Sequence, residues 1–109
     1  MQLSFESKAL RAICENETEA KSKLGTKAAS LLQHRLADLE AASSIDDLLL
    51  GNPRLRDGAG GDTMVLDLCD GYIIAFTANH EKNPVTEDNQ LDWGRVTRIK
   101  IIDIVSDHG

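Results

Sequence analysis

The chain has 109 residues, of which 41% are hydrophobic and 28% are charged, and its net charge is -6. This length fits one domain over 1–109, and the composition excludes an intrinsically disordered chain. No apolar run approaches the roughly 20 residues that cross a bilayer, and the opening MQLSFESKALR lacks a secretory signal, so we expect a cytoplasmic protein without membrane contact.

The negative charge is concentrated in the second half of the chain. Residues 1–60 carry eight Lys or Arg and nine acids, whereas residues 61–109 carry four and nine. Phosphates attract clustered Lys and Arg, so the acidic half disfavours general nucleic-acid binding and leaves local basic patches as the candidates.

The chain opens with a strand and a short helix. LSFE at 3–6 alternates apolar and polar side chains, which is typical of a strand with one buried face at the edge of a sheet. Ser7 can cap a helix in which Leu10, Ile13 and Cys14 share one side.

A long helix follows, with Asn16 or Thr18 as its cap. Apolar residues recur at helical intervals from Ala20 to Leu39 and give the strongest secondary-structure signal of the chain. Gly25 interrupts the pattern and indicates a bend or a close helix contact.

Turn-forming residues separate this helical half from the rest. In SSIDDLLLGNP at 43–53, Ser44 with Asp47 resembles a capping box for a single helical turn, and the Gly-Asn-Pro at its end breaks the chain. RDGAGGD at 56–62 is glycine-rich, but Asp62 stands where a phosphate-binding loop needs Lys and Ser or Thr, which favours a plain connection.

The second half predicts strands. TMVLDL at 63–68 and YIIAFT at 72–77 form a hairpin around Asp70-Gly71, a polar loop covers 78–90, a short turn begins at Asp92, and RIKIIDIV at 98–105 is the last strand. Its apolar residues fall on both faces, so this strand is either central or bulged. The order predicts a two-layer α+β fold, with N-terminal helices packed on a small antiparallel sheet.

Histidines and cysteines are the first candidates for chemistry. His34 in mid-helix and His80 in the polar loop are expected at the surface, and neither has a partner at a metal-binding interval. His108 follows a rigid strand, where an imidazole suits general acid or base work unless the chain end simply frays, and Asp107 could orient it. The only cysteines, Cys14 and Cys69, are expected as buried thiols.

Two basic pairs are the candidates for binding phosphate. Arg54 and Arg56 are two positions apart in an extended segment, so they share one side, and Arg98 and Lys100 do the same at the start of the last strand. The pairs could hold a phosphate backbone, or they could be solubilising charges on exposed strands.

Several segments, in this order, resemble the RelE-like toxins of bacterial toxin-antitoxin modules, in particular the HigB branch of plasmid maintenance killer proteins. They are LSFESKALRAICEN, LQHRLADLEAA, GNPRLR, GYIIAF, LDWGRVTRI and the terminal IIDIVSDH. The resemblance implies a RelE-like fold and a ribosome-dependent messenger RNA endoribonuclease that inhibits translation without a metal or cofactor.

The resemblance also implies a site. His108 matches the family's terminal histidine, while Ser106 stands in place of its acid and Asp107 in place of its aromatic residue. Such chemistry needs a base for the ribose hydroxyl and positive charge at the phosphate. We assign His108, Arg56 and Asp107 as catalytic residues, and Arg54, Arg98, Lys100 and Tyr72 as RNA-binding residues.

This chain departs from the family at basic positions. Ala59 and Gly60 are neutral where further basic residues are typical, and Tyr72 is followed by Ile73 instead of arginine. One lost preorganised contact can cost about 3 to 4 kcal/mol of transition-state stabilisation. The alternative is therefore a diverged protein that binds partners without cleaving RNA. Expected partners are a helix-turn-helix antitoxin, the ribosome and messenger RNA, and a homo-oligomer is left open.

Overall fold

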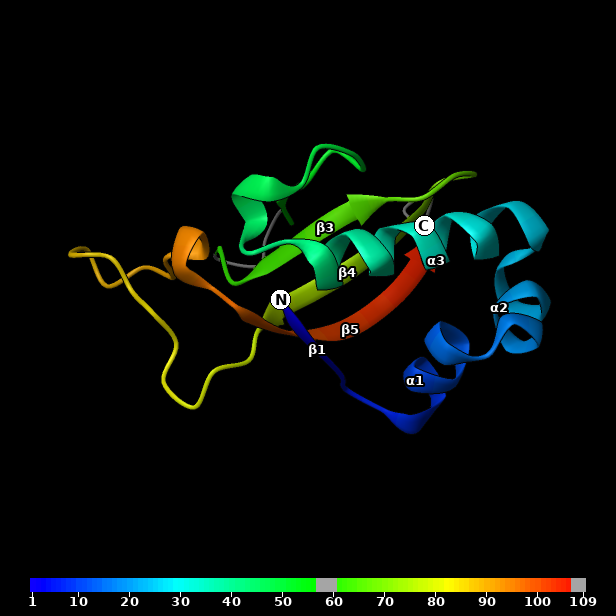
Figure 1. The fold of residues 1–109 in the computed structure, drawn as a ribbon, viewed down its shortest axis with the longest axis horizontal. Helices are drawn as coiled ribbons and strands as arrows, with labels where there is room; N and C mark the ends of the chain where they lie inside the picture. Colours follow the sequence, from blue (N-terminus) through cyan, green and yellow to red (C-terminus); the bar gives the residue numbers. More distant parts are fainter. Residues whose placement is uncertain (57–60, 107–109) are drawn as a thin grey trace.

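The computed structural model describes residues 1–56 and 61–106 and shows helices packed on one face of a twisted sheet (Figure 1). The sheet has the strand order β1-β5-β4-β3-β2. The strands are β1 (Gln2–Phe5), β2 (Arg54–Leu55), β3 (Thr63–Asp67), β4 (Tyr72–Ala78) and β5 (Arg98–Ser106). The prediction of an α+β fold with N-terminal helices on a small sheet is confirmed. Asp107 and His108 lie outside the described residues.

The helices are α1 (Lys8–Glu15), α2 (Glu17–Leu24) and α3 (Thr26–Ala41), with single turns η1 (Ile45–Asp47) and η2 (Trp93–Arg95). Side-chain caps determine where α1 and α2 begin. The Ser7 hydroxyl accepts from the Leu10 N–H at 3.1 Å, and the side-chain Oδ1 of Asn16 accepts from the Glu19 N–H at 3.2 Å. Each side chain pairs one of the backbone N–H groups that the start of a helix leaves without a partner. Asn16, and not Thr18, is therefore the N-cap of α2.

Gly25 divides the predicted long helix in two. Its backbone has φ 86° and ψ 164°, a conformation that glycine adopts far more readily than other residues. Apolar residues recur on both sides of Gly25, so the sequence predicted one helix that bends or makes a close contact at this glycine, whereas the structure shows two helices, α2 and α3.

The prediction of an antiparallel sheet is wrong for one strand pair. β2, β3, β4 and β5 form an antiparallel meander, but β1 pairs with β5 in parallel, with Leu3 opposite Ile99, so the sheet is mixed. A central strand offers the same hydrogen-bonding groups to a parallel or an antiparallel partner, so orientation follows from the path of the chain through α1 to α3. The strand β2 at the opposite edge was expected only as an extended segment.

The last strand was predicted to be either central or bulged, and it is both. β5 lies between β1 and β4, and its register with β4 shifts between Ala75 and Phe76, where Ala75 faces Asp103 and Phe76 faces Ile101. Ile102 is the extra residue of this bulge. The bulge moves Ile104 to the face of Ile99 and Ile101, where all three contact the main core, while Ile102 lies on the other face.

The main core lies between the sheet and α3, which crosses it in Figure 1. Phe76 is fully buried at its centre and meets Trp93 edge to face, with ring centroids 5.9 Å apart. Leu32, Leu39, Ile74, Ile99 and Ile101 are also fully buried there. Trp93 therefore attaches the loop after β4 to the core.

The β3–β4 hairpin has the predicted turn. Asp70 and Gly71 have φ of 57° and 79°, the left-handed pair that suits a tight two-residue turn. In the described part of the chain, no helix has the length and apolar character needed to cross a membrane.

Candidate functional site

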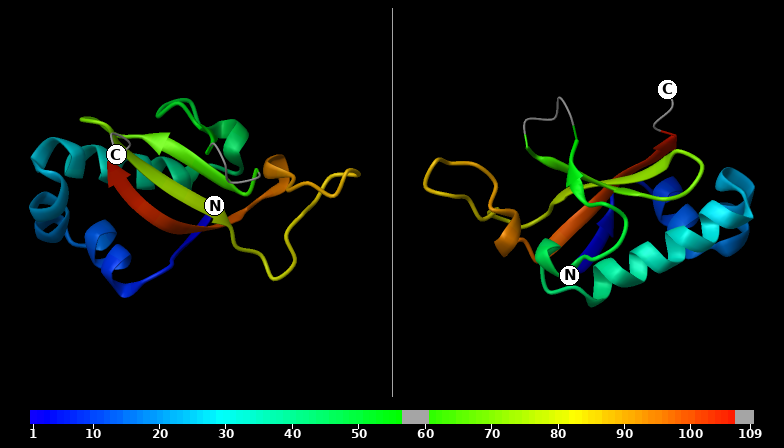
Figure 2. Two further views of the ribbon diagram at one scale, coloured as in Figure 1. Left: turned by 180° about the vertical axis from the view of Figure 1, so that it is seen from behind. Right: turned by 90° about the horizontal axis from the view of Figure 1, so that it is seen from above.

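The two faces of the sheet differ in what covers them. α1, α2 and α3 supply side chains to the core on one face, whereas the apolar cluster on the other contains only residues of β3, β4 and β5 among those described. We call this second face the open face, and Figure 2 shows it directed away from α3. By strand alternation and register, its residues are Gln2, Ser4, Arg54, Arg56, Thr63, Val65, Asp67, Ile73, Ala75, Thr77, Arg98, Lys100, Ile102, Asp103 and Val105.

Both predicted basic pairs lie on the open face. The Arg56 N–H donates to the Thr63 carbonyl at 2.8 Å, and Thr63 pairs with Thr77, Thr77 with Lys100, and Lys100 with Ser4. These five residues form one row across the whole sheet. The row has a cation near one edge and another on β5, and such groups bind phosphate oxygens. Of the hydroxyl groups in the row, that of Thr63 is buried and that of Ser4 already bonds Asn79 and the Ile99 carbonyl.

Acidic residues share the same face. Arg54 Nη1 lies 3.0 Å from Asp67 Oδ1 in a half-exposed ion pair, and Asp103 lies in the row that Arg54 begins, across Val65 and Ala75. The alternation of β3 and β5 places these acids there, although only the basic pairs were predicted. The described open face thus carries Arg54, Arg56, Arg98 and Lys100 against two aspartates, one of which already binds an arginine.

The structure does not bring Tyr72 together with the basic pairs. Tyr72 starts β4 opposite Ser106 and shares the helix-covered side with Ile74 and Phe76. Its neighbour Ile73 lies on the open face, where it is 3% exposed and packs with Val65. The position where RelE-like toxins have arginine is therefore part of an apolar cluster in this protein.

The remaining predicted site residues lie outside the described structure. They are Asp107 and His108, together with Ala59 and Gly60 of the glycine-rich loop. β5 is described to Ser106, two residues before His108. The assignment of this histidine as the base therefore continues to rest on the sequence.

The other two histidines differ in their surroundings. His34 is exposed on α3, as expected, and lines a cavity of about 550 Å³ together with Glu17 and Lys21 of α2. His80 was expected to be solvated, but its Nε2 accepts from the Thr97 N–H at 3.0 Å and so connects the loop to the start of β5. Within 1–56 and 61–106, no group of three or more His, Cys, Asp or Glu is placed to hold a metal ion.

Cys14 is a buried thiol, as predicted, whereas Cys69 is only partly buried beside the hairpin turn. Burial, with a smaller contribution from the Glu15 carboxylate, raises the pKa of Cys14 from 9.0 to about 12. A thiol that keeps its proton is a poor nucleophile, so Cys14 has a packing role.

Comparisons with protein-family models, with curated proteins and with solved structures gave no match.

Proposed function

We propose that this chain is a RelE-like toxin of the HigB branch, which binds messenger RNA on the open face and cleaves it at the ribosome. The observation that carries the proposal is the placement of Arg54, Arg56, Arg98 and Lys100 on one sheet face that no described helix covers. Phosphate contacts position a nucleic acid, and Arg contacts to phosphate are charge-assisted. The motifs from LSFESKALRAICEN to IIDIVSDH support the same assignment.

The proposed reaction is attack of a ribose 2′-hydroxyl on the adjacent phosphorus, with loss of the 5′-oxygen of the next nucleotide. His108 takes the hydroxyl proton as general base, and Asp107 orients the imidazole. The departing 5′-oxygen takes its proton from water, because Ser106 stands where RelE-like toxins have their acid, and a 2′,3′-cyclic phosphate is left on the other fragment. Arg56 stabilises the additional negative charge on the phosphate oxygens in the transition state. The other basic residues of the open face hold flanking phosphates, and a helix-turn-helix antitoxin is the expected inhibitor.

A second candidate is a diverged, non-catalytic member that binds its partner without cleaving RNA. Two observations favour it: Asp67 neutralises Arg54, and Ile73 is buried where the family has arginine. Both reduce the positive charge available to an RNA transition state. This candidate predicts a stable complex with the antitoxin while transcripts stay intact.

The test is to induce the protein in a bacterial host and map transcript ends, comparing wild type with His108→Ala. The matched control is His34→Ala, since His34 is an exposed histidine on the opposite, helical layer. The proposal expects growth arrest and new 5′ ends for wild type and the control, and neither for His108→Ala. Intact transcripts with wild-type protein at full expression would support the second candidate.

A further inference from the structure

Two neighbouring leucines are exposed beside a cavity near the end of α3. Leu49 is 91% exposed and Leu50 is 62% exposed. Single exposed apolar residues are common on soluble proteins, but a contiguous apolar patch next to a hollow is typical of an interaction site. The cavity measures about 420 Å³ and is lined by Asp38, Ala41, Ala42, Asp47, Leu48, Leu49 and Leu50, which we call the leucine pocket.

The backbone that presents these leucines is held at both ends. The Ser43 N–H donates to Asp47 Oδ2 at 2.8 Å, and the Leu48 N–H donates to the Ile45 carbonyl at 3.0 Å. At the other end, the Asp67 N–H donates to the Gly51 carbonyl at 2.6 Å. The backbone that carries the leucines is thus ordered before a partner binds, and this lowers the entropic cost of binding.

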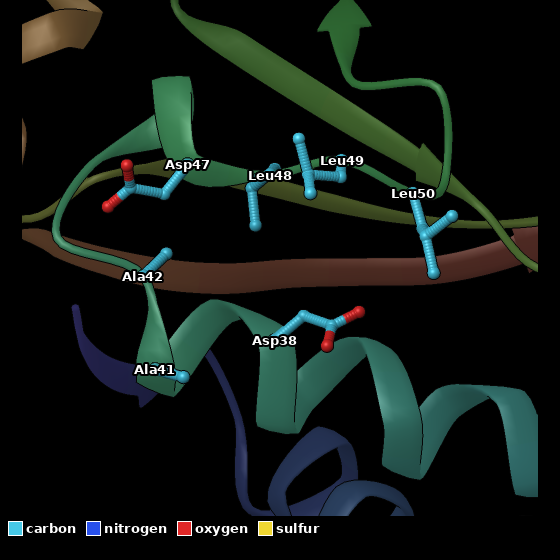
Figure 3. Close-up of a pocket in the computed structure, with 7 residues that line it drawn as sticks. All are labelled: Asp38, Ala41, Ala42, Asp47, Leu48, Leu49 and Leu50. Carbon is cyan, nitrogen blue, oxygen red and sulfur yellow. The ribbon is translucent and has the colours of Figure 1, made fainter.

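The opposite wall of the pocket consists of small residues. Figure 3 shows Leu48 and Leu50 pointing toward α3, where Ala41 and Ala42 leave room for an inserted side chain. Asp38 faces the leucines from α3, and Asp47 lies at one end of their row. The pocket therefore has an apolar floor and an acidic rim.

The charge around the pocket selects the occupant. Residues 38–50 contain Asp38, Glu40, Asp46 and Asp47 and no Lys or Arg. Two cations lie nearby. Arg35 lies 3.7 Å from Asp38, but its side chain is only 13% exposed, and the Met1 ammonium donates to the Leu39, Glu40 and Ala42 carbonyls. The four carboxylates of this segment outnumber these two cations, so the rim stays acidic toward solvent. An occupant that inserts apolar side chains here gains most if Lys or Arg flanks them.

We infer that the leucine pocket is a docking site for an amphipathic helix of another protein, with leucine-like side chains on one face and Lys or Arg beside them. Helices bind grooves in this way through apolar residues spaced three and four apart. The pocket belongs to α3 and the segment before β2, so this inference is independent of RNA cleavage on the open face. A protein without nuclease activity can still carry the site.

The test uses a labelled helical peptide with leucines at i, i+3, i+4 and i+7 and lysines elsewhere, measured by fluorescence anisotropy. A scrambled peptide of the same composition and a peptide with Glu in place of Lys are the comparisons. We expect the first peptide alone to bind the wild type, and added salt to weaken it. Binding should weaken roughly tenfold or more in Leu49→Ser and in Leu50→Ser. Asp38→Asn should weaken it by a smaller factor.

Leu55→Ser is the matched control, because Leu55 is an exposed leucine, 48%, that does not line the pocket. It should bind as the wild type does. In amide NMR spectra of the wild type, the peptide should shift signals of residues 41–50 most, a readout that needs no variant. Equal binding of the scrambled or Glu peptide, equal loss in Leu55→Ser, or shifts elsewhere would overturn the inference. So would a concentration-dependent dimer that Leu49→Ser abolishes, since the occupant would then be a second copy.

Discussion

Arg54 Nη1 and Asp67 Oδ1 lie 3.0 Å apart across the β2–β3 pair, so one arginine of the open face is already engaged by a carboxylate. Both side chains are partly exposed, at 37% and 42%, and such pairs add at most about 1 kcal/mol to stability. The pair therefore matters more for the net charge of the open face, and so for the RNA binding proposed there, than for folding.

Replacing Asp67 with asparagine should strengthen RNA binding. Asp67→Asn removes the carboxylate that holds Arg54, so one more cation can contact a phosphate, and affinity for single-stranded RNA should rise a few-fold. The slope of log affinity against log salt should steepen by about 0.7. Asp88→Asn changes the net charge equally in an exposed loop and should have little effect in the same filter-binding titration. Equal gains in both variants would contradict a specific role for the pair.

Removing one of the two cations on β5 should have the opposite effect. Lys100→Gln removes one of the proposed phosphate contacts in the row that includes Thr77 and Arg56, so RNA affinity should fall roughly three- to tenfold at about 0.1 M salt, with a shallower salt slope. Lys27→Gln on α3 is the control and should bind as the wild type does. An unchanged salt slope for Lys100→Gln would show that RNA does not contact this residue.

Gly25→Ala should destabilise the fold through the backbone alone. A Cβ at Gly25 meets no atom within 4 Å, but φ is 86°, so alanine must adopt a strained conformation that costs about 1 to 3 kcal/mol. Gly94→Ala is a matched control, because Gly94 has no positive φ and its new Cβ would make only ordinary contacts at 3.5 and 3.6 Å. Urea unfolding followed by circular dichroism should separate the two variants. Equal free energies of unfolding would show that the α2–α3 junction can rearrange.

Alkaline pH should weaken the fold through Cys14. The folded state holds the thiol proton up to about pH 12, whereas the unfolded chain releases it near pH 9.0, so the stabilising difference is complete below pH 9 and is lost as pH rises toward 12. Between pH 9 and pH 10 this loss amounts to about 1 kcal/mol.

Cys14→Ala supplies the comparison, because it keeps every other titrating group and lacks the thiol. The free energy of unfolding, measured by urea titration at both pH values, should fall by about 1 kcal/mol less in the variant than in the wild type. If both proteins respond equally to pH, the buried thiol is not the source of the alkaline loss.

Local signals in the sequence predicted the elements that depend on neighbouring residues. Ser7 binds the Leu10 N–H as a cap does, and Asp70-Gly71 forms the turn that its residue types predict. The spacing of two within 54–56 and 98–100 also correctly placed each basic pair on one side of its strand. These features need only interactions between residues a few positions apart, so residue types and intervals are enough to determine them.

Tertiary structure decided which of these elements meet. The parallel pairing of β1 with β5 joins Leu3 to Ile99, and the bulge at Ile102 assigns Ile104 and Asp103 to opposite faces. The same pairing gathers the two basic pairs on one face and sets Asp67 against Arg54. A strand edge accepts a partner in either direction and in more than one register, so only the packing of α1 to α3 and the path of the chain select the arrangement.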